Sequence, residues 1–107
     1  MDWKFAEALA DTMFALSTPS RVQILFCLLD QPHDVSQLTE AIGMEQSAIS
    51  HQLRILRELA LVRVERDGSR RVYALYDEHV AALLNEGARH VERRSGGRAG
   101  ISGKRGA

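Results

Sequence analysis

Apolar residues recur along this chain at two spacings, and the change between them divides the sequence into elements. Spacings of three and four residues are typical of one face of a helix. They predict four successive helices, over residues 3–16, 19–29, 36–42 and 46–59. The segment 62–76 reads instead as two strands folded at Asp67-Gly68, a strong signal for a tight hairpin. A final helical stripe predicts a helix from about residue 77 to residue 92.

Residues typical of helix ends mark the boundaries of the second and third helices. Thr18 is placed to cap the second helix, and Pro19 occupies its first position, where a missing N–H is tolerated. Gly43 is expected to end the third helix, because glycine readily adopts the left-handed conformation found there. The short turn 43–45 then joins two helices in the manner of a helix–turn–helix.

The expected fold is mainly α with a small β-hairpin: a winged helix–turn–helix of the order α-α-α-α-β-β-α. Residues 1–93 are expected to form one domain that binds DNA and dimerises. A homodimer is expected because the apolar stripes of the first and last helices exceed what so small a domain covers by itself. Residues 94–107 hold five glycines and four basic residues, which predicts a flexible basic tail.

The helix over 46–59 presents a polar face that fits a DNA groove. Opposite its apolar positions stand hydroxyl, imidazole, amide and guanidinium groups, which hydrogen-bond base edges in the major groove of double-stranded DNA. The expected DNA contacts on this helix are Gln46, Ser47, Ser50, His51, Gln52, Arg54 and Arg57. On the hairpin, Arg66, Arg70 and Arg71 are expected along the phosphates of the same duplex.

The charge of the chain supports a local DNA-binding face. The 107 residues carry 14 basic and 14 acidic side chains, a formal net charge of zero. Six arginines nevertheless fall between residues 46 and 73, against three acidic residues, which suits a protein that binds one operator and releases it. No apolar run approaches the ~20 residues of a membrane span. The lone Cys27 lies inside an apolar run, so a reducing cytoplasm is the expected location.

The last predicted helix carries oxygen and nitrogen donors suited to nickel, cobalt or zinc. Asp77 and His79 lie at its start, and His90 lies eleven residues after His79, on the same helical face. That separation is ~16 Å along a helix axis, so one chain cannot bring the three to one metal. Two antiparallel copies of the helix in a homodimer can do so, and they would form two identical sites. Histidines at a surface or a dimer interface, with no metal, are the alternative.

Three runs of the sequence carry a family resemblance: ALSTPSRVQILFCLL, LTEAIGMEQSAISHQLRILRELALV and RDGSRRVYAL. They resemble the ArsR/SmtB family of bacterial metal-responsive transcriptional regulators, and the resemblance extends over residues 5–92. It implies a homodimeric repressor that leaves operator DNA when metal binds. It also implies a metal site with the spacing Asp-x-His-x10-His, completed by a Glu or His where this chain has Arg93.

Arg93 cannot coordinate a metal, so three protein ligands completed by water or backbone groups are expected. Such a set suits six-coordinate nickel better than tetrahedral structural zinc, and nickel is the expected metal, with cobalt or zinc as alternatives. Glu92 is next to the missing fourth ligand position, which is occupied by Arg93, but it projects about 100° away from that position around the helix. Glu92 therefore joins the set only if the helix end frays. Thiolate sensing is not expected, since the segment 34–38 reads DVSQL.

Two other interpretations are compatible with the sequence. In the first, the same DNA-binding fold carries a vestigial metal site, and another ligand or a regulatory partner protein controls it, as an activator instead of a repressor. In the second, the helix and hairpin dock on a protein, and the chain is a protein–protein interaction module. An enzyme is not expected, because the sequence has no glycine-rich phosphate loop, nucleophile elbow or paired-carboxylate pocket.

Overall fold

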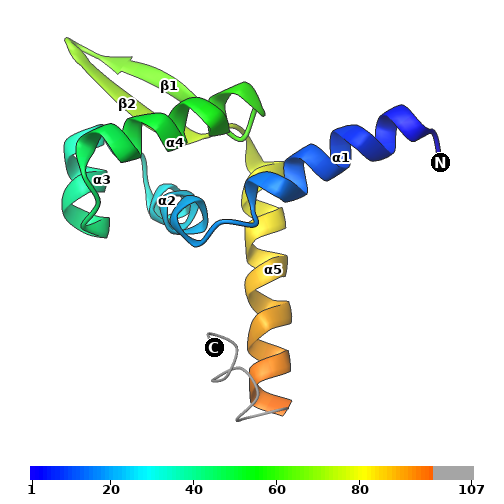
Figure 1. Ribbon diagram of the computed structural model, residues 1–107. Helices are drawn as coiled ribbons and strands as arrows, with labels where there is room; N and C mark the ends of the chain where they lie inside the picture. The colour runs from blue at the N-terminus through cyan, green and yellow to red at the C-terminus, as the bar shows by residue number, and fades with distance from the viewer. Residues whose placement is uncertain (98–107) are drawn as a thin grey trace.

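Five helices and one two-stranded antiparallel hairpin make up the computed structural model, which describes residues 1–97 (Figure 1). The elements are α1 Trp3–Ala15, α2 Pro19–Asp30, α3 Val35–Ile42, α4 Gln46–Glu58, β1 Val62–Asp67, β2 Arg70–Leu75 and α5 Glu78–Gly97. The predicted order is confirmed, and most ends lie within one residue of their predicted positions.

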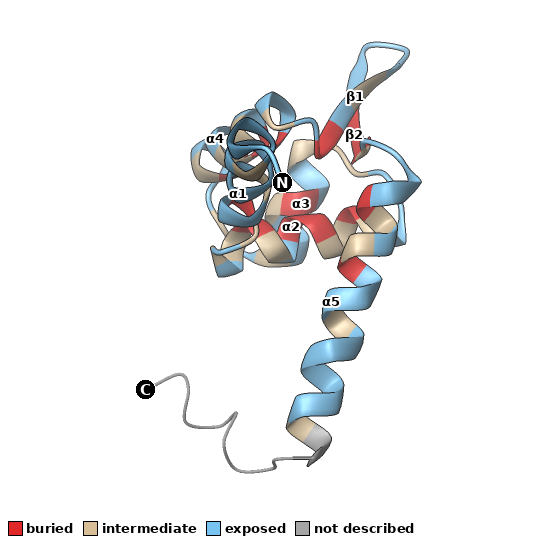
Figure 2. Ribbon diagram, turned by 90° about the vertical axis from the view of Figure 1, so that its right-hand side faces the viewer, coloured by how far each residue is buried: buried red, intermediate tan, exposed pale blue. Residues whose placement is uncertain are grey.

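The apolar core lies where α2 meets α3, α4 and the base of the hairpin (Figure 2). Ile24 and Leu25 of α2 are fully buried, and so are Ile49 and Leu56 of α4. Burying a side chain of this size contributes about 1.5–3 kcal/mol, so these residues supply much of the apolar stabilisation of the domain. The same packing decides which face of α4 is left to the solvent.

A capping box fixes the start of α3 and connects it to the hairpin. Oδ1 of Asp34 accepts a hydrogen bond of 2.8 Å from the Gln37 N–H, and the Gln37 side chain accepts one of 2.9 Å from the Asp34 N–H. Oδ2 of Asp34 also pairs with Arg70 of β2 at 2.8 Å. Beside this cluster, His33 and Tyr73 exchange two backbone hydrogen bonds. α3 therefore begins one residue earlier than predicted, and the hairpin is held against its first turn.

Two predicted end signals differ in the structure. Thr18 is the N-cap residue of α2 by position, but its side chain makes no capping hydrogen bond. The hairpin turn consists of Gly68 and Ser69, because Asp67 pairs with Arg70 in the ladder, so the prediction of a fold at Asp67-Gly68 is wrong by one residue. Gly68 has a φ of +68°, and glycine at the first of two turn residues is typical of the type II′ turn. Asp-Gly and Gly-Ser are both hairpin signals, and here the second one decides the register.

α5 is longer than the sequence predicted, and it projects from the body (Figure 1). It continues to Gly97, so residues 94–97 of the predicted tail are helical, while the remainder of that tail lies outside the described residues. Arg93 and Arg94 explain the extension, because arginine is a good helix former and its charge is favourable near a helix C-terminus. The glycines at positions 96 and 97 therefore do not end the helix before Gly97.

The two terminal helices differ in how far their own chain covers them. Val80 and Leu84, on the first turns of α5, are buried in the core of their own chain. The apolar stripe of the last helix was expected to remain uncovered by its own chain, but this part of the stripe packs against α2 and β2. Val91, further along α5, is exposed. α1 also projects from the body, and Ala15 is its only buried residue (Figures 1 and 2).

Length and apolarity sufficient to cross a membrane are found in no single helix of the described residues. α1 and α2 meet both conditions only when taken together, as a pair bent by 86°.

Replacing Asp34 with alanine is expected to lower the free energy of unfolding by about 1–2 kcal/mol, since the change removes both the α3 cap and the partner of Arg70. The hydrogen bond from the Gln37 N–H, and then the bond from Arg70, hold the pKa of Asp34 below its ordinary value. A lowered pKa means that this stability is present above about pH 4 and is lost as the pH falls below it. Urea denaturation of parent and variant between pH 6 and pH 3 measures both effects.

Asp67→Ala is the control, because Asp67 pairs with the same arginine at 3.5 Å but caps no helix. It should cost less than about 0.5 kcal/mol. Equal losses for the two variants would contradict this account of Asp34.

Candidate nucleic-acid interface and metal-binding residues

The exposed face of α4 holds most of the predicted DNA contacts. Because Ile49, Leu53 and Leu56 face the core, the side chains of the opposite face point to solvent. The predicted contacts exposed there are Gln46, Ser47, Ser50, His51, Arg54 and Arg57. A polar helix face beside a hairpin has the shape of a reader for the major groove with a wing for the DNA backbone.

Gln52 differs from the other predicted contacts. It is partly buried, and its Oε1 accepts a hydrogen bond of 3.0 Å from Nη1 of Arg21 in α2. The amide oxygen that would bind a base is therefore engaged within the protein, so Gln52 is less available to DNA than its exposed neighbours, and its predicted DNA contact stays a prediction. Sequence reasoning missed Arg21, although an arginine inside an otherwise apolar helix is the signal of a buried charge that needs partners.

The arginines of the wing fall into two groups. Arg70 is held by Asp34 at 2.8 Å and by Asp67 at 3.5 Å, so carboxylates of the protein already compensate its charge. Arg66 and Arg71 face each other directly across the two strands, and within residues 1–97 neither pairs with a carboxylate. Like charges opposite one another in a ladder are unfavourable. A phosphate between them would relieve that repulsion, which makes these two the stronger phosphate-binding candidates.

A polar hollow lies between α4 and the β-hairpin, which is called the wing. Its volume is about 340 Å³, and it lies between the first turn of α3, α4 and β2. The polar residues that line it are Asp34, Ser36, Ser50, Arg70, Arg71 and Tyr73. Hydroxyl and guanidinium groups of this kind hydrogen-bond phosphate oxygens and set the register of a protein on DNA. Asp34 and Ser36 were not among the predicted site residues, although the run DVSQ marks a helix start at their position.

Asp77 and His79 lie together at the start of α5. Oδ1 of Asp77 accepts the backbone N–H groups of His79 and Val80, at 3.0 and 3.3 Å. Oδ2 lies 3.5 Å from Nδ1 of His79, whose side chain is 92% exposed. Partial desolvation raises the pKa of Asp77, but the hydrogen bonds from the His79 side chain and the two N–H groups outweigh it and leave the pKa below its ordinary value. One carboxylate oxygen and one imidazole are thus free to bind a cation from solvent.

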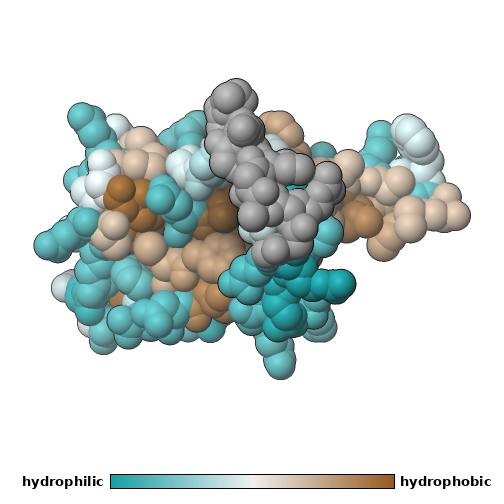
Figure 3. All heavy atoms as spheres, turned by 90° about the horizontal axis from the view of Figure 1, so that it is seen from below, coloured by the Kyte–Doolittle hydropathy of each residue, from teal (hydrophilic) through white to brown (hydrophobic). Residues whose placement is uncertain are grey.

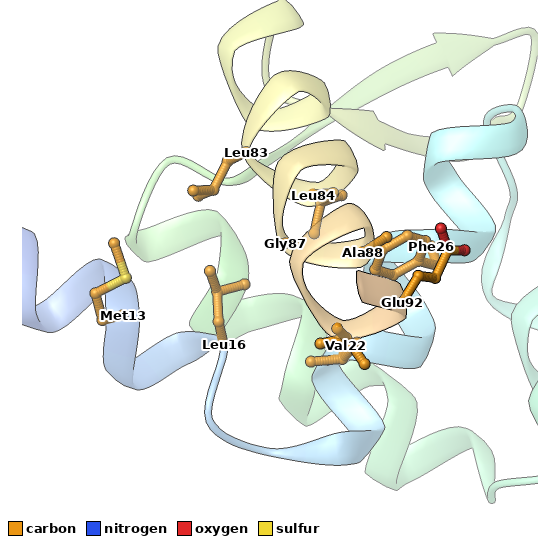
Figure 4. Close-up of a pocket in the computed structure, with 10 residues that line it drawn as sticks. Met13, Leu16, Val22, Phe26, Leu83, Leu84, Gly87, Ala88 and Glu92 are labelled. Atoms are coloured by element: carbon orange, nitrogen blue, oxygen red, sulfur yellow. The ribbon is translucent and has the colours of Figure 1, made fainter. Parts of the chain in front are cut away.

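The remaining predicted metal ligands lie elsewhere on α5. His90 lines a shallow hollow with Arg93 and Arg94, whereas Glu92 lines a different hollow between α1, α2 and α5 (Figure 4). Within the described residues of one chain, no three His, Cys, Asp or Glu side chains gather in a group that could hold a metal ion. The predicted ligands therefore fit a metal only if two chains contribute, and Glu92 does not lie with His90.

An apolar surface is left open beside α5. A hollow of about 590 Å³ lies between the C-terminal end of α1, α2 and α5 (Figure 4). The apolar residues that line it include Met13, Leu16, Val22, Phe26, Leu83 and Val91. Trp3, Phe5 and Leu9 are exposed further along α1, and apolar surface is visible both on the underside of the body and on the projecting helix (Figure 3). Contiguous apolar surface of this kind marks an interaction site.

Cys27, which lies inside the apolar run of α2, is only partly buried. Burial, and then the nearby Asp30, raise the pKa of its thiol. The thiol form is unreactive, and a redox role for Cys27 has no support here.

Residues 18–64, which contain α2, α3, α4 and the start of the wing, match the model of the arsR family of bacterial regulatory proteins. The HTH-type transcriptional regulator NmtR of Mycobacterium tuberculosis is 54% identical over 92 residues, which cover 86% of this chain and 77% of NmtR. This chain belongs to the arsR family. A transcriptional repressor SmtB homolog of Synechocystis is 40% identical over 87 residues, covering 81% of this chain and 66% of that relative.

Solved structures of arsR-family proteins share the fold. The solution structure of apo-NmtR matches with a TM-score of 0.74 at 54% identity, over 87% of this chain and 78% of that chain. A homodimeric winged helix–turn–helix DNA-binding domain of Mycobacterium bovis, a possible ArsR-family transcriptional regulator, matches with a TM-score of 0.77 at 30% identity. It covers 88% of both chains. The expected family and fold class are therefore confirmed, and the chain is a DNA-binding transcriptional regulator of a family without enzymatic activity.

Arg54→Ala and Arg71→Ala are expected to weaken operator binding in different ways. Arg54 lies on the exposed face of α4, so its loss should cost about 1–3 kcal/mol and relax the sequence preference. Arg71 lies on the wing opposite Arg66, so its loss should weaken binding evenly across sequences and lower the salt slope by about one unit. Fluorescence anisotropy on operator and unrelated duplexes, over a range of salt concentrations, measures both. Equal, sequence-independent effects would show that the recognition face is misplaced.

Proposed function

We propose that this chain is a cytoplasmic, homodimeric repressor that binds operator DNA through α4 and the wing and is released by a transition metal. The metal is proposed to be nickel, with cobalt and zinc as alternatives, bound at two equivalent sites between the subunits. The observation that carries the DNA-binding part is the exposed polar face of α4 beside Arg66 and Arg71, two facing cations that no carboxylate of the described chain compensates.

Dimerisation is supported by the apolar surface that one chain leaves uncovered. Leu9 and Met13 of α1 are more than two-fifths exposed, and Val91 of α5 is 50% exposed. These side chains flank or line the 590 Å³ hollow, so a second copy seated there buries apolar area from both terminal helices. The Mycobacterium bovis domain with the same fold is homodimeric.

Metal binding is supported by the donors on α5. Asp77 uses Oδ1 to cap the helix and keeps Oδ2 next to the exposed imidazole of His79, so one oxygen and one nitrogen donor are already paired. His90 is exposed on the same helix and supplies a third donor once an antiparallel copy of α5 brings it to the partner's pair. A metal shared by both chains would fix the angle between the two recognition helices, which is how it would act on DNA binding.

The choice of nickel and of repression rests on chemistry and on relatives. Three protein ligands completed by water suit six-coordinate nickel, and Arg93 stands where a fourth protein ligand would be needed for a closed zinc site. The Synechocystis relative is named a repressor, and repression is the mode of regulation that the family resemblance implies.

A second candidate function keeps the DNA-binding dimer and removes the metal. Arg93 and Arg94 flank His90 in its hollow, and two cations beside the site disfavour a bound metal ion. In this case another ligand or a partner protein would control the regulator. Calorimetric titration of the apo-protein with nickel, with and without promoter DNA, separates the two: the first function requires tight nickel binding that weakens DNA binding, and the second requires neither.

Nickel is expected to bind at two sites per dimer through Asp77, His79 and His90 of the partner subunit. A mixed dimer with His79→Ala in one chain and His90→Ala in the other places both defects in the same composite site. It should therefore keep one tight site, while each single-variant homodimer keeps none. Binding should also weaken on acidification, because an imidazole must be neutral to bind a metal. Glu92→Ala is the matched control and should bind like the parent. Parent-like binding by both histidine homodimers would leave α5 with a purely structural role.

The chain is expected to be a dimer at micromolar concentration, and Leu9→Asp should shift it towards monomer because a carboxylate then replaces an apolar contact on α1. The fold should survive, since Leu9 is 41% exposed and lies outside the core. Sedimentation velocity measures the shift, and circular dichroism checks the fold. Glu7→Lys, on another face of α1, should leave the dimer intact; a parent that sediments only as monomer would refute the proposed interface.

A further inference from the structure

Arg21 of α2 is a buried cation whose partners belong to two other helices. Only 6% of the residue is exposed. Its Nε donates to the Ala15 carbonyl at 2.8 Å and its Nη2 to the Phe14 carbonyl at 3.2 Å. Its Nη1 donates to Oε1 of Gln52 at 3.0 Å, and its Cζ lies 5.5 Å from the centre of the Phe14 ring. Among the described residues, no carboxylate pairs with it.

The physics of a buried guanidinium makes this arrangement specific. A charge removed from water is costly unless its donors are satisfied. Here the compensation comes from two carbonyls at the C-terminal end of α1, which carries the negative end of the helix dipole; the Phe14 carbonyl also accepts the Ser17 N–H at 3.0 Å. Because the guanidinium is a rigid planar fork, it satisfies the carbonyls of α1 and the amide of Gln52 together only at one relative placement of the three helices. Arg21 therefore fixes geometry in addition to filling space.

α1 depends on this contact more than the other helices do. Its side chains from Trp3 to Phe14 are largely exposed, and Ala15 is its only buried residue. Figure 1 shows α1 leaving the body from this end alone. The bonds from Arg21 reach the last two residues of α1, so they hold the point about which the whole helix would swing.

We propose that Arg21 and Gln52 form a joint that sets the angle between α1 and the recognition helix α4, so that dimerisation determines how the two α4 helices are spaced on DNA. The proposal rests on the function proposed above, because it needs α1 to dock on a second copy. Gln52 is then a positioning residue, not a base contact. If the joint is loosened, the α4 helix and wing of each subunit still bind their own half-site. The spacing between the two α4 helices of the dimer is then no longer fixed.

Gln52→Ala tests the joint, with Gln46→Ala as its matched control: the same change on the same helix, at a position that is exposed. The probes are a duplex with two half-sites, selected by the parent protein from a randomised library, the same duplex with one base pair inserted between the half-sites, and a duplex with a single half-site. All three are measured with the metal-free full chain. Thermal melting checks that each variant is folded.

Gln52→Ala should bind the single half-site within about twofold of the parent but lose roughly tenfold on the two-half-site duplex, the loss expected for one hydrogen bond to a charged group. Its discrimination against the inserted base pair should shrink by a similar factor. Gln46→Ala should instead lose affinity for the single half-site as well. Arg21→Lys, which keeps the charge but not the fork, should match Gln52→Ala, and the double variant should add little to either.

Three results would overturn the joint. One is a half-site loss for Gln52→Ala equal to its two-half-site loss, which would make Gln52 a DNA contact. Another is unchanged binding and unchanged spacing discrimination in a folded Gln52→Ala. The third is simple additivity of the folded single variants. If the parent protein selects no duplex at all, the proposed function fails and this role for the joint fails with it; in the other three cases the proposed function stands.

Discussion

The packing of α4 into the apolar core is the contact on which the rest of this molecule depends. Ile49, Leu53 and Leu56 of α4 are buried in that core, where α4 lies against α3 and β1, and a rotation of α4 by one residue, about 100°, would carry them out of the core. That rotation would also bury the serines, His51 and the arginines of the opposite face without partners. The apolar core and the polar DNA-binding face are therefore two consequences of one helix orientation.

The outer half of the wing is placed by polar contacts, because the strand ends next to the turn are exposed. The inner half of the hairpin reaches the core, where Val62 and Tyr73 are buried and Val64 and Leu75 pack against it. Beyond that point, Asp34 holds Arg70 while it caps α3, and His33 bridges to Tyr73. These contacts tie the wing to the helix that precedes α4, so α4 and the wing keep a fixed placement relative to each other. Among the predicted DNA contacts on the wing, Arg70 is held by Asp34, whereas Arg66 and Arg71 face each other and remain the candidates for phosphate binding.

The terminal helices, by contrast, each keep features that one chain does not use. α1 leaves its apolar stripe exposed, and the candidate metal donors of α5 do not meet within one chain, because they are too far apart on one helix. The proposed dimer would resolve both at once, since a second copy would cover the stripe and bring a separated donor to its partners. Control by a metal and control of head spacing by Arg21 would then act on the same variable, the relative placement of two α4 helices.

Elements and their order were predictable from local sequence, because helical spacing, a proline, glycines and a strand pattern act over a few residues. The exposed face of α4 followed for the same reason, since an apolar stripe implies its opposite. What needed the tertiary structure was every role set by a distant partner. In the sequence Gln52 cannot be distinguished from its neighbours, but in the structure its oxygen accepts a hydrogen bond from Arg21, 31 residues earlier. Likewise, Arg70 resembles Arg71 in the sequence, but in the structure it is bound by Asp34, 36 residues away. Val80 and Leu84 belong to the protomer core because α2 and β2 reach them. Periodicity identifies which face of an element is buried, but only packing decides what lies against it, because the partner comes from another part of the chain.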